Sequence, residues 1–140
     1  MAVFNIQSIS MHFKKNKMLP YTSCLFATIV LHAYHLKISS YHHVFLAVTV
    51  LSILFHCTKS PKIGIVDKIT AHSAFVLVLT DTRLAIEKGK TWLLAFPMWV
   101  MVFWFAQSFA PARREQLHVL LHFAVIVGMH AYLHELHSAK

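Results

Sequence analysis

The chain has 140 residues, of which 57% are hydrophobic and 13% charged, and its mean hydropathy is +0.58. Soluble globular proteins carry about 25% charged residues, so this composition excludes a disordered chain and disfavours an ordinary water-soluble domain. The formal net charge is +8, but the 13 Lys and Arg residues are scattered between apolar runs. They form no continuous basic face, so no nucleic-acid partner is expected. Two Cys residues outside any CxxC arrangement imply no disulfide framework.

Five apolar runs follow one another along the chain, each close to the roughly 20 residues that a helix needs to cross a membrane. They cover residues 19–36, 41–57, 65–82, 91–109 and 115–136. Short breaks with turn-forming residues separate them, and none shows the alternation of a half-buried strand. We therefore predict an all-α integral membrane bundle of about five transmembrane helices. Residues 1–18 are predicted to be an amino-terminal segment, and residues 19–140 a single transmembrane domain.

The cations that flank these runs predict how the bundle is oriented. With five crossings, eight Lys and Arg residues fall on the amino-terminal side of the membrane and five on the other side. Cytosolic loops carry an excess of Lys and Arg, so the amino terminus is predicted to be cytosolic, in a membrane that the sequence does not identify. The first run is interpreted as a span, because no small-residue cleavage site for a signal peptidase follows it.

Twelve histidines stand among few other polar residues, and polar side chains inside a membrane are costly enough to need a reason. An up-and-down arrangement brings the end of the second helix and the starts of the third and fifth helices to the same side of the membrane. Five polar residues then share one depth: Ser52, His56, Asp67, His118 and His122. The sequence therefore predicts one polar site near the cytosolic face.

The spacing indicates that three of these residues are metal ligands. Residues four apart lie on one face of a helix, so His118 and His122 can hold one metal ion, with His56 from another helix as the third ligand. Three imidazoles leave a fourth tetrahedral position for water, as in catalytic zinc sites, and neutral imidazole suits Zn²⁺. We expect the three ligand nitrogens to lie within roughly 3 to 4 Å of one another.

The two other residues are candidates for catalysis. Asp67, beside the predicted metal site, is placed to hold or deprotonate a water molecule whose pKa zinc lowers to about 7. Ser52 lies on the same helix face as His56. Its hydroxyl is a candidate either to bond a carbonyl or oxyanion of the substrate or to orient a metal ligand.

This arrangement resembles the signature of the CREST superfamily, which includes alkaline ceramidases and the progestin and adiponectin receptors. The resemblance is carried by Ser52-x-x-x-His56, by Asp67 at the head of the next helix, and by His118-x-x-x-His122 at the head of the last. It implies a zinc ion held by the three histidines, with Asp67 and Ser52 around the hydrolytic water, and cleavage of a ceramide-like lipid amide. Members of that family have seven helices, so a homo-oligomer is a candidate arrangement in which a second copy completes the cavity.

Other functions fit the same histidines and stay open. One is a membrane oxidoreductase, with haem between two histidines or a di-iron site built from HxxxH and His-His pairs. Another is a non-enzymatic receptor, scaffold or proton-conducting protein that retains a metal site.

The remaining histidines are expected to pack between helices or to lie at the membrane interface. At the far end of the last run stand His130, His134 and His137. They are too far along the helix to share the metal of His122, although a second metal site with His32 or His35 is geometrically possible. Asp81 is expected to end the third helix in solvent.

Overall fold

The computed structural model describes residues 18–138, which form five α-helices and no strand. The helices are α2 (Met18–His35), α3 (Ser39–Thr58), α4 (Pro61–Glu87), α5 (Ala95–Phe109) and α6 (Arg114–Ser138). Short 3-10 helices, η1 (Thr91–Leu94) and η2 (Pro111–Arg113), precede α5 and α6. The prediction of an all-α bundle is confirmed, and each predicted run overlaps a different α-helix, the run at 91–109 covering η1 as well as α5. The predicted segment 1–18 lies outside the described residues except for its last member.

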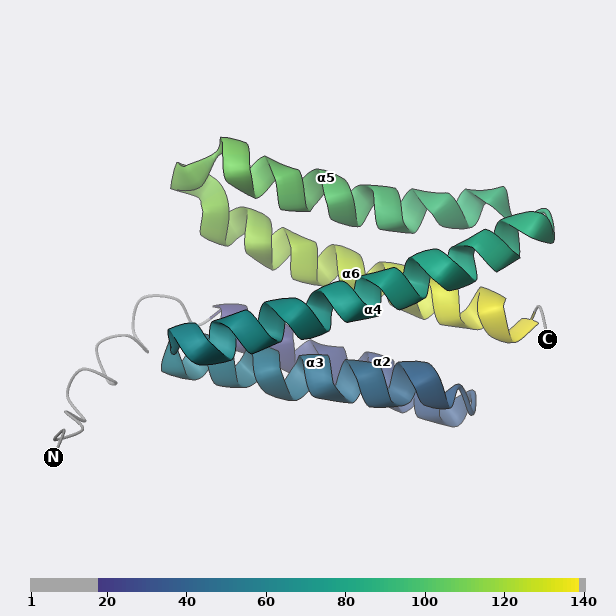
Figure 1. Cartoon of the computed structure of the whole chain (residues 1–140), viewed down its shortest axis with the longest axis horizontal. Helices are drawn as coiled ribbons and strands as arrows, with labels where there is room; N and C mark the ends of the chain where they lie inside the picture. The colour runs from purple at the N-terminus through teal and green to yellow at the C-terminus, as the bar shows by residue number, and fades with distance from the viewer. Residues whose placement is uncertain (1–17, 139–140) are drawn as a thin grey trace, which may run out of the picture.

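The helices run alternately up and down, so that the start of α2, the end of α3 and the start of α4 lie at one end of the molecule (Figure 1). The end of α5 and the start of α6 lie at that same end. α2 packs against α3 and α6, α3 packs against α4, and α5 packs against α6. This topology brings together the chain segments that carry the five predicted site residues.

α4 differs most from its predicted length. The run at 65–82 covers only its middle, because the helix begins at Pro61 and continues to Glu87. Proline suits the first helical position, where no backbone N–H is needed for a hydrogen bond. At the other end Gly89 has a φ of +82°, and the N–H of Lys90 donates to the carbonyl oxygen of Ala85 at 3.0 Å. A glycine in this left-handed conformation is a common way for a helix to end.

The longer α4 places Asp81 inside the helix, so the expectation that it ends the helix in solvent is wrong. The fully buried hydroxyl of Tyr41 on α3 donates to Asp81 Oδ2 at 2.8 Å. Nearby, the hydroxyl of Tyr132 on α6 donates to the carbonyl oxygen of Val78 at 3.1 Å. These bonds join α3, α4 and α6 at the end of the bundle opposite the predicted site.

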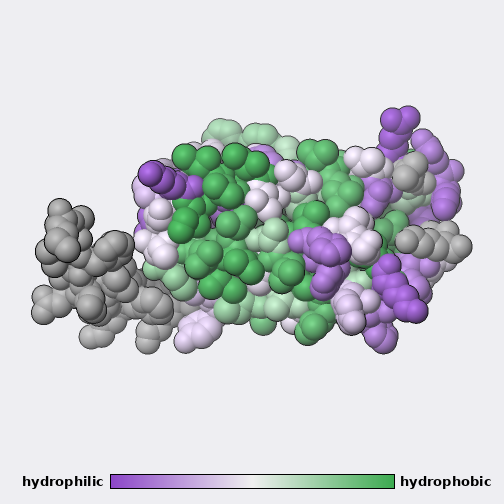
Figure 2. Space-filling view, turned by 60° about the horizontal axis from the view of Figure 1, so that its bottom comes forward, coloured by the Kyte–Doolittle hydropathy of each residue, from purple (hydrophilic) through white to green (hydrophobic). Residues whose placement is uncertain are grey.

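Four segments are long and apolar enough to cross a membrane: Ser39–Thr58, Pro61–Glu87, Thr91–Phe109 and Pro111–Ser138. Among the described residues α2 does not meet the same criterion, although it was predicted as the first span. Apolar side chains form a broad belt on the surface, and hydrophilic side chains gather mainly at one end (Figure 2). The composition of the surface is therefore that of a membrane protein.

Gly128 provides a test of the contact between α5 and α6. A Cβ atom at Gly128 would lie 2.1 Å from Cδ2 of Phe96, so a larger side chain forces the two helices apart. We expect Gly128→Val to lower the free energy of unfolding in detergent by about 1–3 kcal/mol. Ala131→Val, on the exposed face of the same helix, is the matched control. In a Phe96→Ala background the penalty should shrink, and an unchanged penalty would contradict this packing.

Candidate metal centre

Three histidines converge at the end of the bundle where α3 finishes and α6 begins. His56 lies in the last turn of α3, and His118 and His122 lie in the second and third turns of α6. One ligand nitrogen from each lies within 4.8 Å of the others. The ring centroids of His56 are 5.3 Å from those of His118 and 5.6 Å from those of His122. The predicted convergence is confirmed, although the nitrogens are somewhat farther apart than the roughly 3 to 4 Å expected around a bound ion.

Burial makes this cluster unusual. His56 and His122 are only 6% and 5% exposed. Neither nitrogen of His56 has a hydrogen-bond partner among the described residues, and both are buried. A buried polar group without a partner costs about 1–3 kcal/mol, so we expect a ligand to bind at least one nitrogen of the His56 ring. A metal ion shared with the two neighbouring imidazoles fits this requirement, and the three residues together can hold one.

Hydrogen bonds fix the tautomer of His118. Its Nδ1 lies 3.0 Å from Oε1 of Gln107 on α5. The amide nitrogen of Gln107 donates to the carbonyl oxygen of Phe103 at 3.4 Å, which turns Oε1 toward the histidine. An amide oxygen only accepts hydrogen bonds, so Nδ1 of His118 carries the proton. The lone pair therefore resides on Nε2, which is free to bind a metal ion.

The same reasoning applies to His122. Its Nδ1 lies 2.9 Å from Oγ1 of Thr22 on α2, and the Thr22 hydroxyl donates its hydrogen to the carbonyl oxygen of Leu19 at 3.0 Å. With that hydrogen already used, Nδ1 of His122 must be the donor to Thr22. Nε2 of His122 is then the ligand atom. Partners of this kind, which set the tautomer and orientation of metal-binding histidines, are typical of metal sites.

Ser52 and Asp67 line the same cavity as the three histidines. Ser52 is 4% exposed, and its Oγ lies 3.0 Å from Oγ of Ser23 on α2. Ser23 donates to the carbonyl oxygen of Leu19, so the Ser52 hydroxyl donates to Ser23 and keeps its own lone pairs available. Asp67, two turns into α4, faces the cavity but is not one of the three grouped ligands.

The cavity has a volume of about 620 Å³ and takes its walls from all five helices. Its interior is mainly apolar, with side chains that include Phe26, Phe45, Val78, Phe96 and Met129. The polar residues gather at the end where the three histidines lie. This volume is in the range of small-molecule pockets, on the order of 300–1,000 Å³, and its chemistry suits an amphiphile with its polar part near the histidines.

The other histidines do not join the metal centre. Nδ1 of His32 lies 2.8 Å from Nδ1 of His130, whose Nε2 lies 3.0 Å from Oγ1 of Thr28. His42 and His43 contact backbone carbonyl oxygens at the start of α3, at the opposite end from His56. Within residues 18–138 the three histidines at 56, 118 and 122 are the one group of three or more potential ligands close enough to share an ion.

Three residues that support the site were not predicted from the sequence: Thr22, Ser23 and Gln107. They carry no metal-ligand pattern, and the contact from Thr22 to His122 joins residues 100 positions apart. The available signal was polarity itself, since Gln107 is the one amide in the apolar run at 91–109.

Comparison with known protein families, curated proteins and solved structures finds no match for this chain.

We expect the purified protein to bind one divalent metal ion per chain, as measured by elemental analysis. Replacing His56, His118 or His122 by alanine removes one of three ligands. Each change should weaken metal affinity by more than the roughly 10- to 100-fold that the loss of an outer hydrogen bond costs. His43→Ala and His134→Ala, which alter histidines outside the group, should leave the metal content unchanged. Equal metal content in all five variants would exclude this site.

A second prediction concerns the residues that orient the ligands. Thr22→Val and Gln107→Leu each remove one partner of a ligand Nδ1, and metal affinity should fall about 10- to 100-fold. Two matched controls accompany them. Thr28→Val alters another threonine of α2, one that contacts His130, and Gln116→Leu alters an exposed glutamine in the first turn of α6. Competition with a chelator of known affinity measures the change. Control variants that weaken binding equally would contradict the assigned roles.

Proposed function

We propose that the protein is a zinc-dependent membrane hydrolase that cleaves a ceramide-like lipid amide. The observation that carries the proposal is the group of three imidazoles at the polar end of an apolar cavity, two of them buried and one of these with both nitrogens unpartnered among the described residues. The resemblance to the CREST pattern supports the choice of a lipid amide as substrate.

The donor set favours zinc. Three neutral nitrogen ligands with no thiolate are typical of catalytic zinc sites, in which the fourth position stays open. When bound in such a site, Zn²⁺ supplies Lewis acidity and lowers the pKa of water to about 7. His118 and His122 present Nε2 because Gln107 and Thr22 hold their Nδ1 protons.

The remaining steps fall to Asp67 and Ser52. The Asp67 carboxylate, which faces the cavity from α4, accepts a proton from the attacking water and returns it to the leaving amine nitrogen. The Ser52 hydroxyl donates to Ser23 and so accepts a hydrogen bond from the water or from the amide N–H of the substrate. The apolar walls hold the acyl chain and exclude bulk water, which strengthens the electrostatic interactions at the site.

The oxidoreductase alternative differs in its metal. A haem or di-iron site would bring iron, and haem would add a Soret absorption band. His42 and His43, the second pair invoked for a di-iron site, lie at the far end of α3 from His56. Iron without zinc in the purified protein would favour that alternative and contradict the proposal. A non-enzymatic role predicts bound metal without hydrolysis.

Asp67→Asn tests the assigned base. Hydrolysis of a lipid amide should fall roughly 10²- to 10⁴-fold, because asparagine cannot accept the proton, while bound zinc should remain at one ion per chain. Glu87→Gln, which alters an exposed carboxylate on the same helix, is the matched control and should retain activity. Measured hydrolysis that survives Asp67→Asn would show that this carboxylate is not the base.

A further inference from the structure

Three cations line the mouth of the cavity beside the candidate metal centre. They are Lys59 immediately after α3, Lys68 in α4, and Arg114 at the start of α6. Lys62 and Arg113 belong to the same end of the bundle but do not line the cavity. Cations commonly anchor helix ends to lipid headgroups. The three lining residues are distinguished from such anchors because they come from three separate parts of the chain and line the same cavity.

Their positions in the chain tie these cations to the site residues. Arg114 precedes His118 by four residues on α6 and so lies on the same face of that helix. Lys59 follows His56 by three residues in a left-handed turn with φ of 55°, where its N–H donates to the carbonyl oxygen of Phe55 at 2.8 Å. Lys68 is the neighbour of Asp67 on α4. Each cation is therefore beside a different member of the candidate site.

The charges at this mouth do not cancel. Two acids, Asp67 and Glu115, line the cavity with the three cations. The ion pairs of Arg83 with Glu87 and of Lys90 with Glu135 lie at the opposite end of the bundle. A ligand with negatively charged oxygens would contribute charge-assisted hydrogen bonds here, which are stronger than those of a neutral group.

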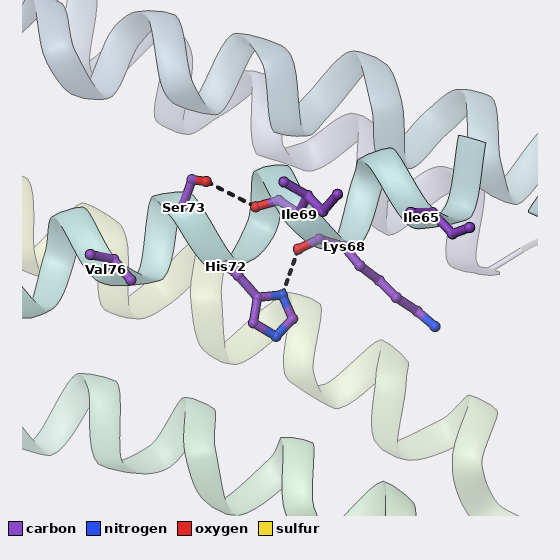
Figure 3. Close-up of a pocket in the computed structure, with 6 residues that line it drawn as sticks. All are labelled: Ile65, Lys68, Ile69, His72, Ser73 and Val76. Carbon is purple, nitrogen blue, oxygen red and sulfur yellow. Dashed lines mark hydrogen bonds between the residues drawn. The ribbon is translucent and has the colours of Figure 1, made fainter. Parts of the chain in front are cut away.

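Two residues that line the cavity, Lys68 and His72, also line a second pocket on the outer surface of α4. This open pocket, called the groove below, is lined by residues of α4 alone, among them Ile65, Ile69 and Val76 (Figure 3). Lys68 and His72 also line the main cavity, so the groove and the cavity meet at these two residues. The His72 ring lies 4.5 Å from that of Trp104 on α5, and its Nδ1 donates to the carbonyl oxygen of Lys68. An acyl chain on the groove would therefore bring a polar head to Lys68.

We propose that the cavity binds an acyl amide whose headgroup carries an anionic group, a carboxylate or a phosphate, held by Lys59, Lys68 and Arg114. The inference rests on the proposed function for the presence of the amide bond. The ligand's amide then lies at the three histidines, its chain in the apolar cavity, and its charge at the mouth.

The test compares two probes with the same chain and amide, N-palmitoylglycine, which bears a carboxylate, and N-palmitoylethanolamine, which is neutral. Binding is measured on the full chain in nanodiscs of neutral phosphatidylcholine, in an Asp67→Asn background so that turnover does not interfere. We expect the carboxylate probe to bind about tenfold more tightly or better. Equal affinity for the two probes would overturn the proposal.

Variants at the mouth locate the effect. Lys59→Gln, Lys68→Gln and Arg114→Gln should each reduce the preference for the carboxylate probe, and all three residues are exposed, so folding should be preserved. Lys62→Gln and Arg113→Gln, at the same end but outside the cavity, are the matched controls. A preference that falls equally in the controls would show general surface attraction and would overturn the assignment.

Two further measurements are needed. One distinguishes a lipid headgroup from a free anion as the ligand, and the other distinguishes failure of the anionic-lipid proposal from failure of the hydrolase proposal. Inorganic phosphate at millimolar concentration should not displace the carboxylate probe; displacement of the probe by phosphate would show a site for a free anion and contradict the lipid assignment. If the carboxylate probe binds preferentially to the protein with native Asp67 but neither probe is hydrolysed, the hydrolase proposal fails while the anionic-lipid site stands. Hydrolysis of both probes at equal kcat/KM, with equal binding, would support the hydrolase proposal and overturn the anionic-lipid site.

Discussion

The main constraint on this structure is the cost of burying an imidazole, that of His56, in an apolar bundle. His56 lies among the residues that fill the end of α3, and both of its nitrogens are buried without a partner within the described part of the chain. A helix bundle built only for packing would place an apolar residue there, because each unsatisfied buried polar group costs about 1–3 kcal/mol. A metal ion shared with His118 and His122, which lie close enough to His56 to bind one, would remove that penalty.

The arrangement of helices follows from that constraint. The ligands come from α3 and α6, which are not neighbours in the chain, and α2 packs against both of them. From α2, Thr22 and Ser23 reach His122 and Ser52, respectively. From the other side, Gln107 on α5 reaches His118. The site is therefore held by four helices, and each ligand on α6 has its proton placed by a residue from a different helix. Rigid second contacts of this kind keep ligands oriented before the ion binds.

The sequence predicted the parts of this site that depend on local periodicity. The spacing of His118 and His122 places both on one helix face, and the count of apolar runs places His56 at the same depth, so the convergence needed no tertiary information. The contacts of Thr22 and Gln107 could not be predicted in the same way, because they depend on which faces of α2 and α5 turn inward. Apolar periodicity is weak in helices whose two faces are both apolar, one toward lipid and one toward protein. The length of α4 was also underestimated, because the helix continues through residues 61–64 and 83–87, which lie outside the apolar run at 65–82.

In α2, polar residues that contact the candidate site also lower the hydropathy of the helix. This helix of 18 residues is the one that does not meet the criterion for a span among the described residues, yet it carries seven buried residues. Two of the seven, Thr22 and Ser23, support the site, and His32 on the same helix bonds to His130 on α6. Polar side chains within a membrane usually face the interior of a bundle, and Thr22 and Ser23 do so here, whereas Leu31 and Tyr34 on the same helix are exposed on the outer surface. The contacts of α2 with α3 and α6 therefore account for part of its polarity: Thr22 and Ser23 support the candidate site at one end, and His32 meets His130 toward the other.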